Sequence, residues 1–253
     1  LVRSRGLGDV YKRQDGVIPW RLELYEELGS TSDLVVTRAK AGEPSGLAVL
    51  ALRQTAGRGS RGRAWSAPQG NLNFSILLRP TRPAAEAGLF SLIAGIAVAQ
   101  ALAGQGARGL SLKWPNDILC NGAKLAGILV DAVPDGPRLD WLVIGIGINL
   151  REAPEIPGRR TTALAAQGLV LAPEDAARAI LARLEPLLEA PGEEIRAAWL
   201  ALGHPLGTKL DIAFAGQRRG GLFAGLSPAG ELLLQCENRI ETLNTGEVLL
   251  ANG

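Results

Sequence analysis

The sequence predicts an α/β protein in which a domain with a mixed β-sheet precedes a small all-β unit. Strand-like apolar runs alternate with helical segments as far as residue 202, which is the pattern of a layered α/β domain. After Gly203, short strands alternate with turn residues instead, as in small β-barrels. Hydrophobic residues make up 47% of the 253 residues, so the chain has enough apolar side chains for a substantial core.

The elements of the large domain follow from periodicity, caps and breakers. Alternation in Arg21–Tyr25 predicts a strand, and Ser30 to Asp33 supply N-caps for a helix that starts there. Asn121-Gly122 is the strongest two-residue signal for a hairpin turn. The other expected elements are strands at 46–52, 71–78, 110–114 and 141–150, a hairpin at 118–130, helices at 84–102, 161–167, 173–189 and 193–202, and a loop at 54–70.

The boundary between the two units is expected near residue 203. Short strands are predicted beyond it at 209–213, 220–226, 231–235 and 247–250. We therefore assign residues 15–202 to the large domain and residues 203–253 to the small β unit.

The first fourteen residues, LVRSRGLGDVYKRQ, have no strand or helix period and no initiating Met. They resemble translated sequencing-adapter read-through, so residues 1–14 are expected to be an artefactual leader outside the fold. A natural disordered arm is the alternative interpretation.

Composition excludes several functional classes. A net charge of only +2 is small for a general nucleic-acid binder, which usually has a large clustered excess. The longest apolar run, 139–150, is interrupted by Asp140 and Asn149 and is too short to cross a bilayer. Cys120 and Cys236 form no disulfide framework and are expected to be buried thiols. We expect a cytoplasmic protein that binds neither nucleic acid nor membrane.

A loop with three arginines and three glycines, Gly57–Trp65, lies between two predicted strands. Glycine lets the backbone approach a ligand closely, and guanidinium groups supply forked donors for phosphate or carboxylate. We expect this Arg-Gly loop (residues 57–65) to be mobile until an anionic ligand arrives, because its cations repel one another. An RNA-binding tail or a solvated loop would also contain such a string. The loop lacks the spacing of a P-loop.

The KWPND segment (residues 113–117) leads into the predicted hairpin. Lysine occurs at only five positions, and two of them, Lys113 and Lys124, flank this turn. A compact ammonium suits carboxylate or phosphate oxygens, so the hairpin is a candidate anion site.

Together and in this order, the strings GRGSRGRAW, KWPNDILCNGAKLAGIL and GIGINL resemble the biotin protein ligases, over residues 20 to 250. The resemblance implies a mixed-sheet catalytic domain of the biotin/lipoate ligase type with a C-terminal SH3-like β-barrel. It also implies a two-step reaction. Biotin and ATP form biotinyl-AMP and pyrophosphate, and a lysine of a biotin carboxyl carrier protein then takes the biotin and releases AMP.

Site residues are implied by the same resemblance. The implied catalytic residues are Lys124, Arg58 and Asp117: Lys124 would contact the biotin carboxylate and the α-phosphate, and Asp117 would orient the incoming amine or accept its proton. Biotin contacts are implied for Ser30, Thr31, Ser32, Gln54, Arg58, Gly59, Ser60, Lys124, Gly127, Gly145 and Gly147. Nucleotide contacts are implied for Arg61, Arg63, Trp65, Lys113, Asn116 and Asn149. No protein metal site is expected, since Mg²⁺ would be bound mainly through phosphates.

The sequence departs from the family pattern at Ser60, where many members have arginine, and at Ser32, where asparagine is usual. Loss of the cation at Ser60 predicts looser retention of the adenylate. His204, the only histidine, is expected to be structural.

Alternatives remain at this stage. The same scaffold supports lipoyl or octanoyl attachment, and a biotin-sensing regulator without catalysis is the non-enzyme interpretation. Some relatives contain an N-terminal DNA-binding domain, which is not expected here because only about twenty residues precede the first strand. A truncated gene is the alternative interpretation. A monomer or a homodimer fits the sequence equally.

Overall fold

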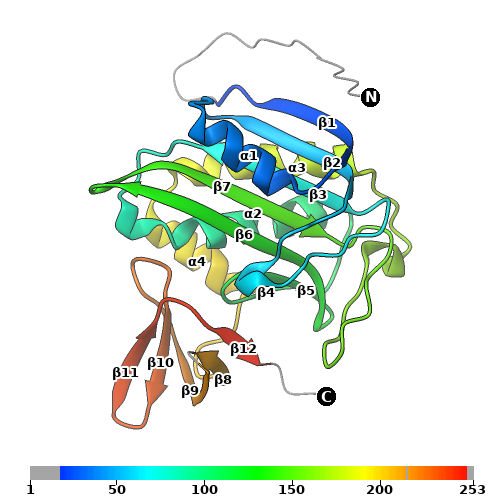
Figure 1. Cartoon of the computed structure of the whole chain (residues 1–253). Coiled ribbons are helices and arrows are strands. Elements are labelled where there is room, and N and C mark those ends of the chain that lie inside the picture. The colour runs from blue at the N-terminus through cyan, green and yellow to red at the C-terminus, as the bar shows by residue number, and fades with distance from the viewer. Residues whose placement is uncertain (1–17, 215, 250–253) are drawn as a thin grey trace.

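A seven-stranded mixed sheet forms the centre of the computed structural model, which describes residues 18–214 and 216–249 (Figure 1). The predicted leader at 1–14 lies outside the described residues. The strand order is β1-β2-β3-β7-β6-β5-β4. Only β1 and β2 run parallel, and the other neighbours are antiparallel. The strands are β1 (Arg21–Leu28), β2 (Leu47–Gln54), β3 (Leu72–Leu78), β4 (Leu110–Lys113), β5 (Asp117–Cys120), β6 (Ala123–Asp135) and β7 (Arg138–Ile148).

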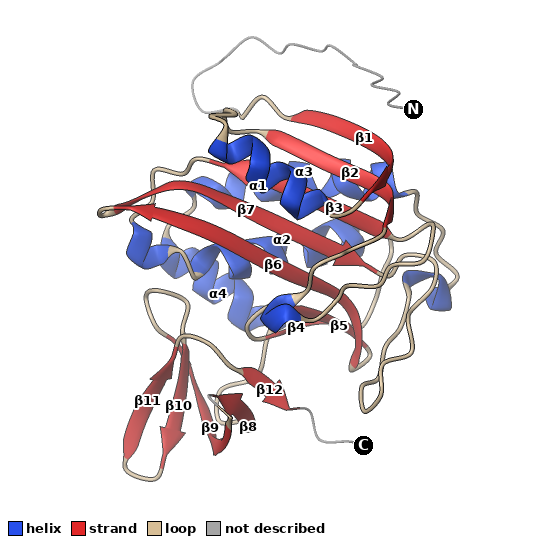
Figure 2. Ribbon diagram, viewed as in Figure 1, coloured by secondary structure: helices blue, strands red, loops and turns tan. Residues whose placement is uncertain are grey.

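Helices cover both faces of this sheet, as Figure 2 shows in blue. Helix α1 (Thr31–Lys40) packs on one face, while α2 (Leu89–Gly104), α3 (Pro173–Glu189) and α4 (Gly192–Leu202) lie behind the other. Successive side chains of a strand point to opposite faces of the sheet, so one strand contributes to the cores on both sides. In β2, Val49 faces the cluster under α1, and Leu50 faces the larger cluster beneath α2.

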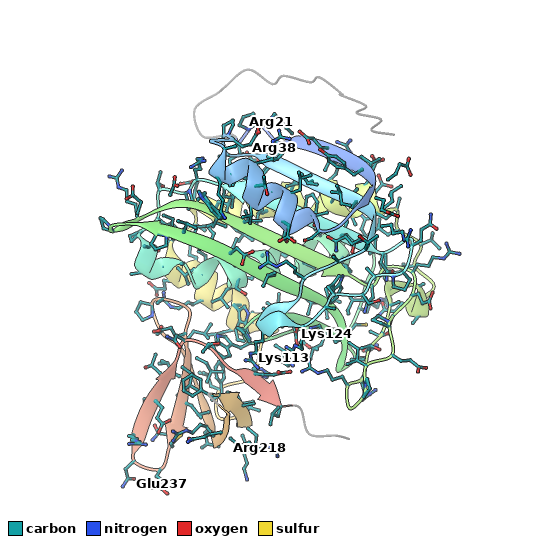
Figure 3. All side chains as sticks on the ribbon, in the orientation of Figure 1. Arg21, Arg38, Lys113, Lys124, Arg218 and Glu237 are labelled. Atoms are coloured by element: carbon teal, nitrogen blue, oxygen red, sulfur yellow. The ribbon has the colours of Figure 1, made fainter. Side chains whose placement is uncertain are left out.

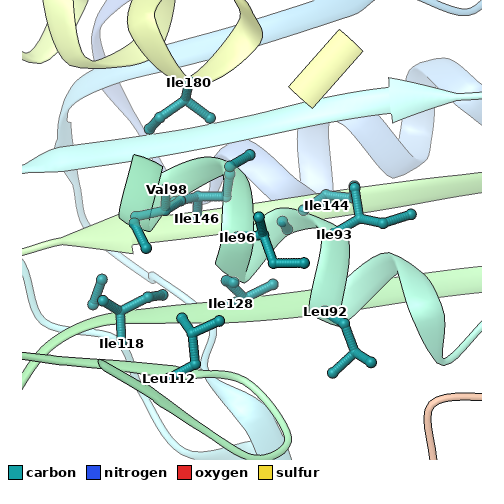
Figure 4. Packing of buried hydrophobic residues seen from close by; sticks show 14 of the residues in the cluster. Leu92, Ile93, Ile96, Val98, Leu112, Ile118, Ile128, Ile144, Ile146 and Ile180 are labelled. Atoms are coloured by element: carbon teal, nitrogen blue, oxygen red, sulfur yellow. The ribbon is translucent and has the colours of Figure 1, made fainter. Parts of the chain in front are cut away.

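Helix α2 is apolar on almost all sides because it packs on the sheet and is flanked by α3 and α4. Ile93 and Ile96 are fully buried, and Figure 4 shows them in the same cluster as Ile144 and Ile146 of β7. Burying one such side chain contributes roughly 1.5–3 kcal/mol. The predicted helix 84–102 begins later than expected, because Ala84–Glu86 form a separate 3₁₀ turn before α2.

The ends of α1 and α3 follow ordinary capping rules. The Ser30 hydroxyl accepts a hydrogen bond from the Asp33 amide at 3.3 Å, so it caps α1 as predicted. Pro173 occupies the first turn of α3, where its missing N–H costs nothing. The helix expected at 161–167 was wrong in type and length, since only Leu164–Gln167 form a 3₁₀ turn.

The small unit is a five-stranded antiparallel sheet with the order β11-β10-β9-β8-β12. Sequence analysis missed β11, because Ile240 is exposed on this strand and only Leu243 is buried, which leaves no apolar face to detect. Cys236 was expected to be buried but is only half-buried, whereas Cys120 is buried. The strands are β8 (Lys209–Phe214), β9 (Gln217–Leu226), β10 (Leu232–Cys236), β11 (Arg239–Leu243) and β12 (Glu247–Leu249).

The small sheet docks directly onto the KWPND segment. The indole Nε1 of Trp114 donates to the carbonyl of Gly230 at 3.2 Å, and Lys113 Nζ donates to the carbonyl of Val248 at 3.3 Å. His204 packs edge-on against Trp199 and Phe223 at this junction. The histidine is thus part of the packing between α4 and the small sheet.

In the part of the chain that the structure describes, no helix has both the length and the apolar character needed to cross a membrane.

Ile96→Ala tests the contribution of the α2 core. The side chain is fully buried, so its truncation is expected to lower the free energy of unfolding by about 2–5 kcal/mol. Urea denaturation followed by circular dichroism measures this change. Val170→Ala is the control, because Val170 is 99% exposed, and its effect is expected to stay within about 0.5 kcal/mol. Equal stabilities of the two variants would contradict the proposed packing.

Candidate active site

Two adjacent cavities lie where the KWPND segment, the Arg-Gly loop and the sheet meet. The first cavity has about 450 Å³ of open space between the start of α1, the Arg-Gly loop and strands β3, β6 and β7. The second cavity has about 600 Å³ and lies between the Arg-Gly loop, the KWPND segment and the turn before β12. Ser60 and Asn116 line both cavities.

Most of the residues predicted to contact biotin meet in the first cavity. Trp65 and Asn116, predicted for the nucleotide, also line it, whereas Ser30 caps α1 behind its wall. Arg61, Arg63, Lys113 and Asp117 line the second cavity instead. The predicted biotin residues that line the first cavity are Thr31, Ser32, Gln54, Arg58, Gly59, Ser60, Lys124, Gly127, Gly145 and Gly147.

Strand register builds the floor of the first cavity. Asn73 of β3 lies beside Gly147 of β7, which lies beside Gly127 of β6. In the next row, Ser75 lies beside Gly145. The isoleucines between the glycines of β7 point into the opposite core. In the GIGIN segment of β7, the glycines therefore form a flat surface toward the cavity, and the isoleucines form an apolar surface toward α2.

A network of hydroxyl and amide groups lines the inner end of the cavity. The Gln54 side-chain oxygen accepts hydrogen bonds from the Thr31 amide at 2.7 Å and from its hydroxyl at 3.0 Å. The Ser75 hydroxyl bridges those of Thr31 and Ser32 at 2.8 and 3.0 Å. Gln54 Nε2 donates to Asn73 at 3.2 Å. Burial of these groups is tolerated because they satisfy one another.

Sequence analysis missed Asn73 and Ser75. The signal was present, since Asn71, Asn73 and Ser75 alternate with Leu72 and Phe74 along an otherwise apolar strand. Polar residues at every second position of a buried strand share one face, which here is the face toward α1 and the cavity.

A buried ion cluster joins the two cavities (Figure 3 labels its two lysines). Asp117 is 7% exposed and pairs with Lys113 at 2.9 Å and with Lys124 through its other oxygen. Burial opposes ionisation of the Asp117 carboxyl, but the ammonium groups of Lys124 and Lys113 more than offset this, so its pKa lies below the usual value. The cluster has two positive charges against one negative charge.

Trp65 narrows the first cavity. Its indole lies against Gly147, where an added Cβ would approach ring atoms to 2.2 Å, and it also contacts the position of Gly127. Lys124 Nζ lies 5.9 Å from the ring centroid, within reach of a cation–π interaction. The indole N–H is buried and has no hydrogen-bond partner in the described structure. Two of the glycines predicted to make room for biotin, Gly127 and Gly147, therefore lie against Trp65.

The arginines of the Arg-Gly loop pair with carboxylates of the protein itself. The expectation that the loop is mobile until an anionic ligand arrives did not consider such pairs. Arg58 pairs with Asp33 at 2.9 Å and with Asp131 at 3.0 Å at the rim of the first cavity. Arg61 and Arg63 pair with Glu247 of β12. The mutual repulsion of these guanidinium groups is therefore relieved without a ligand.

Asn116 and Asn149 have different surroundings. Asn116 Nδ2 donates to the Ile128 carbonyl at 2.6 Å and lies on both cavities. Asn149 Nδ2 donates to the Thr162 carbonyl at 3.1 Å, its Oδ1 is buried without a partner in the described structure, and it lines neither cavity. Among the described residues, no group of three or more His, Cys, Asp or Glu side chains is arranged to hold a metal ion.

Comparison with known proteins agrees with this fold. The model of the Biotin/lipoate A/B protein ligase family matches residues 28–149. The biotin–[acetyl-CoA-carboxylase] ligase of Paracoccus denitrificans is 38% identical over 201 residues, which is 74% of this chain and 83% of the relative. The chain belongs to the biotin protein ligase family, and it is an enzyme of the ligase class.

Solved structures give the same result. The biotin protein ligase of Aquifex aeolicus in complex with biotin and ATP is 30% identical, with a TM-score of 0.76 over 90% of this chain and 97% of that chain. The Leishmania major ligase in complex with biotinyl-5-AMP is 28% identical, with a TM-score of 0.63 over 91% of this chain and 98% of that chain.

Asp117→Asn tests the buried ion cluster. Loss of the carboxylate leaves two ammonium groups together, so the free energy of unfolding at neutral pH is expected to fall by about 3 kcal/mol. Because the folded pKa of Asp117 is lowered, its contribution is complete above its usual pKa of 3.8 and is lost as the pH falls through the folded value.

Urea denaturation at several pH values measures this difference between wild type and variant. Asp140→Asn is the control, because the Asp140 side chain is 50% exposed and its pairing with Arg79 lies far from the cluster in the fold; it is expected to cost no more than about 1 kcal/mol. A difference for Asp117→Asn that shrinks already between pH 7 and pH 5 would contradict the assigned direction.

Proposed function

We propose that this ligase activates biotin with ATP to give biotinyl-AMP, and that it transfers the biotin to a lysine of a biotin carboxyl carrier protein domain. The observation on which this rests is the position of Lys124. Its ammonium lines the first cavity and belongs to the buried cluster that borders the second. It is therefore placed to contact one ligand in each cavity.

The first step brings a carboxylate and a triphosphate together, and these anions repel each other. Fixed cations offset this repulsion without reorganising during the reaction. Lys124 and Arg58 line the first cavity, while Arg61, Arg63 and Lys113 line the second. The bond from the biotin carboxylate oxygen to the α-phosphorus forms as the bond to pyrophosphate breaks.

In the second step, the carrier lysine amine attacks the carbonyl of the mixed anhydride and AMP leaves. Asp117 borders the second cavity and accepts hydrogen bonds from both neighbouring ammonium groups. A carboxylate with a lowered pKa is a weak base. We therefore assign Asp117 the role of orienting the lysines and the incoming amine, in preference to the role of a proton acceptor.

Biotin is favoured over lipoate by the inner end of the first cavity. The ureido ring of biotin has two N–H donors and one carbonyl acceptor, whereas the dithiolane of lipoate has neither. Hydroxyl groups of Thr31 and Ser32, with the Gln54 and Asn73 amides, line this cavity and supply both kinds of partner. A site built to hydrogen-bond its ligand rejects an analogue that lacks those groups.

Mg²⁺ would reach this site with ATP, held mainly by phosphate oxygens, and would neutralise part of their charge.

A reconstitution assay tests the function. Purified protein with biotin, MgATP and a recombinant carrier domain is expected to release pyrophosphate and to increase the carrier mass by one biotinyl group on one lysine. Lipoate in place of biotin is expected to give neither product. Pyrophosphate release with lipoate would favour the lipoyl alternative, and biotin binding without pyrophosphate release would favour a sensor.

Lys124→Ala tests the central cation. The rate of biotinyl-AMP formation is expected to fall by about 100-fold or more, because a fixed charge at the reacting oxygens is lost. Single-turnover assays with labelled ATP measure this rate. Lys40→Ala is the matched control, because Lys40 is exposed at the end of α1; its rate is expected to be unchanged. A wild-type rate for Lys124→Ala would refute the assignment.

A further inference from the structure

Three arginines from two separate loops converge on one carboxylate of the small sheet. Arg61 and Arg63 place Nη1 2.9 and 3.2 Å from Oε2 of Glu247. Arg159, in the loop after β7, pairs with the other oxygen of the same carboxylate. Among the described residues, no other carboxylate forms an ion pair with these three arginines.

The Glu247 carboxylate is better shielded from solvent than the arginines that pair with it. The Glu247 side chain is 17% exposed, whereas those of Arg61 and Arg63 are 40% and 43% exposed. Burial opposes ionisation of the Glu247 carboxyl, but Arg159, Arg63 and Lys113 offset this and keep its pKa below the usual value. Glu247 is thus a fixed anion held by surrounding cations.

These groups lie on the wall of the second cavity, where positive charge remains in excess. Arg61, Arg63, Lys113 and Glu247 all line it. The other carboxylate on this wall, Asp117, is already shared by two lysines. One Glu247 charge therefore faces three guanidinium groups, and two positive charges remain uncompensated.

Carboxylate and phosphate oxygens accept the same forked hydrogen bonds from arginine. A diphosphate has more oxygens and more negative charge than one glutamate, so it competes effectively for the same donors. Glu247 belongs to β12, which pairs with β8 within the small sheet. Displacing it would therefore loosen a contact between the two units.

We propose that Glu247 is an internal stand-in for a phosphate group, which holds the arginines of the second cavity and is displaced by a diphosphate moiety. The choice of ligand rests on the proposed function, in which ATP enters with such a moiety and pyrophosphate leaves. Glu247 is a positioning residue, because it touches arginines and no reacting atom. The small sheet thereby senses whether the second cavity is occupied.

The first test measures binding of inorganic pyrophosphate to the full chain by titration calorimetry. Glu247→Gln keeps the shape and removes the competing charge, so its Kd for pyrophosphate is expected to fall about fivefold. Glu247→Asp keeps the charge and is expected to stay within about twofold of wild type. Glu241→Gln is the matched control, because Glu241 is 18% exposed and pairs with Arg239 inside the same sheet; its Kd is expected to equal that of wild type.

The same variants separate this role from a purely structural one. In adenylate formation, Glu247→Gln is expected to lower the KM for ATP and to leave the KM for biotin unchanged, whereas a damaged fold would impair both. Equal or weaker binding of pyrophosphate by Glu247→Gln, or no binding by wild type, would overturn the proposal. A different result would be that wild type does not bind biotin, while Glu247→Gln binds pyrophosphate more tightly than wild type does. This result would refute the proposed function and leave the proposed role of Glu247 intact.

A measurement on wild type serves where a variant does not fold. Pyrophosphate is expected to slow amide hydrogen exchange in the Arg-Gly loop and to speed it in β12, where Glu247 is released. Exchange in β12 that stays unchanged or slows on saturation with pyrophosphate would contradict displacement. ATP in place of pyrophosphate distinguishes a nucleotide-bound diphosphate from the free product.

Discussion

The site depends on one electrostatic constraint: cations gathered in a small volume repel one another unless carboxylates lie between them. A lone buried ammonium is costly, and two together are worse. Asp117 resolves this for Lys113 and Lys124. Asp33 and Asp131 offset the charge of Arg58, and Glu247 offsets the charges of Arg61 and Arg63. The cations of both cavities are thus held in place by carboxylates of the protein itself.

This arrangement explains why the small sheet packs beside the KWPND segment. Trp114 and Lys113 both donate to backbone carbonyls of the small unit, and Glu247 reaches back to the Arg-Gly loop. The second cavity is therefore bounded by residues of both units. The first cavity belongs to the large domain, where β-strand register places glycines beside polar side chains. The two cavities share Ser60 and Asn116, and the ion pair of Lys124 with Asp117 joins their linings.

Local signals were sufficient for much of the fold. The Ser30 cap, the Asn121-Gly122 turn and the alternation in Arg21–Tyr25 each specify their element over a few residues, so these predictions are confirmed. Predictions failed where local pattern was weak. Strand β11 exposes Ile240, and the 3₁₀ turn at Leu164–Gln167 is too short for a helical period.

The sequence by itself determined the layered fold, the family and the residue types of the site, because caps, turns, periodicity and the three motif strings are all local in the chain. Tertiary structure alone decided which charges pair. Arg61 and Glu247 are joined in space although 186 residues separate them, and Ser75 meets Thr31 through the packing of α1 on the sheet. Such pairings depend on long-range packing and on sharing a limited number of carboxylates among more cations, and neither leaves a local pattern in the sequence.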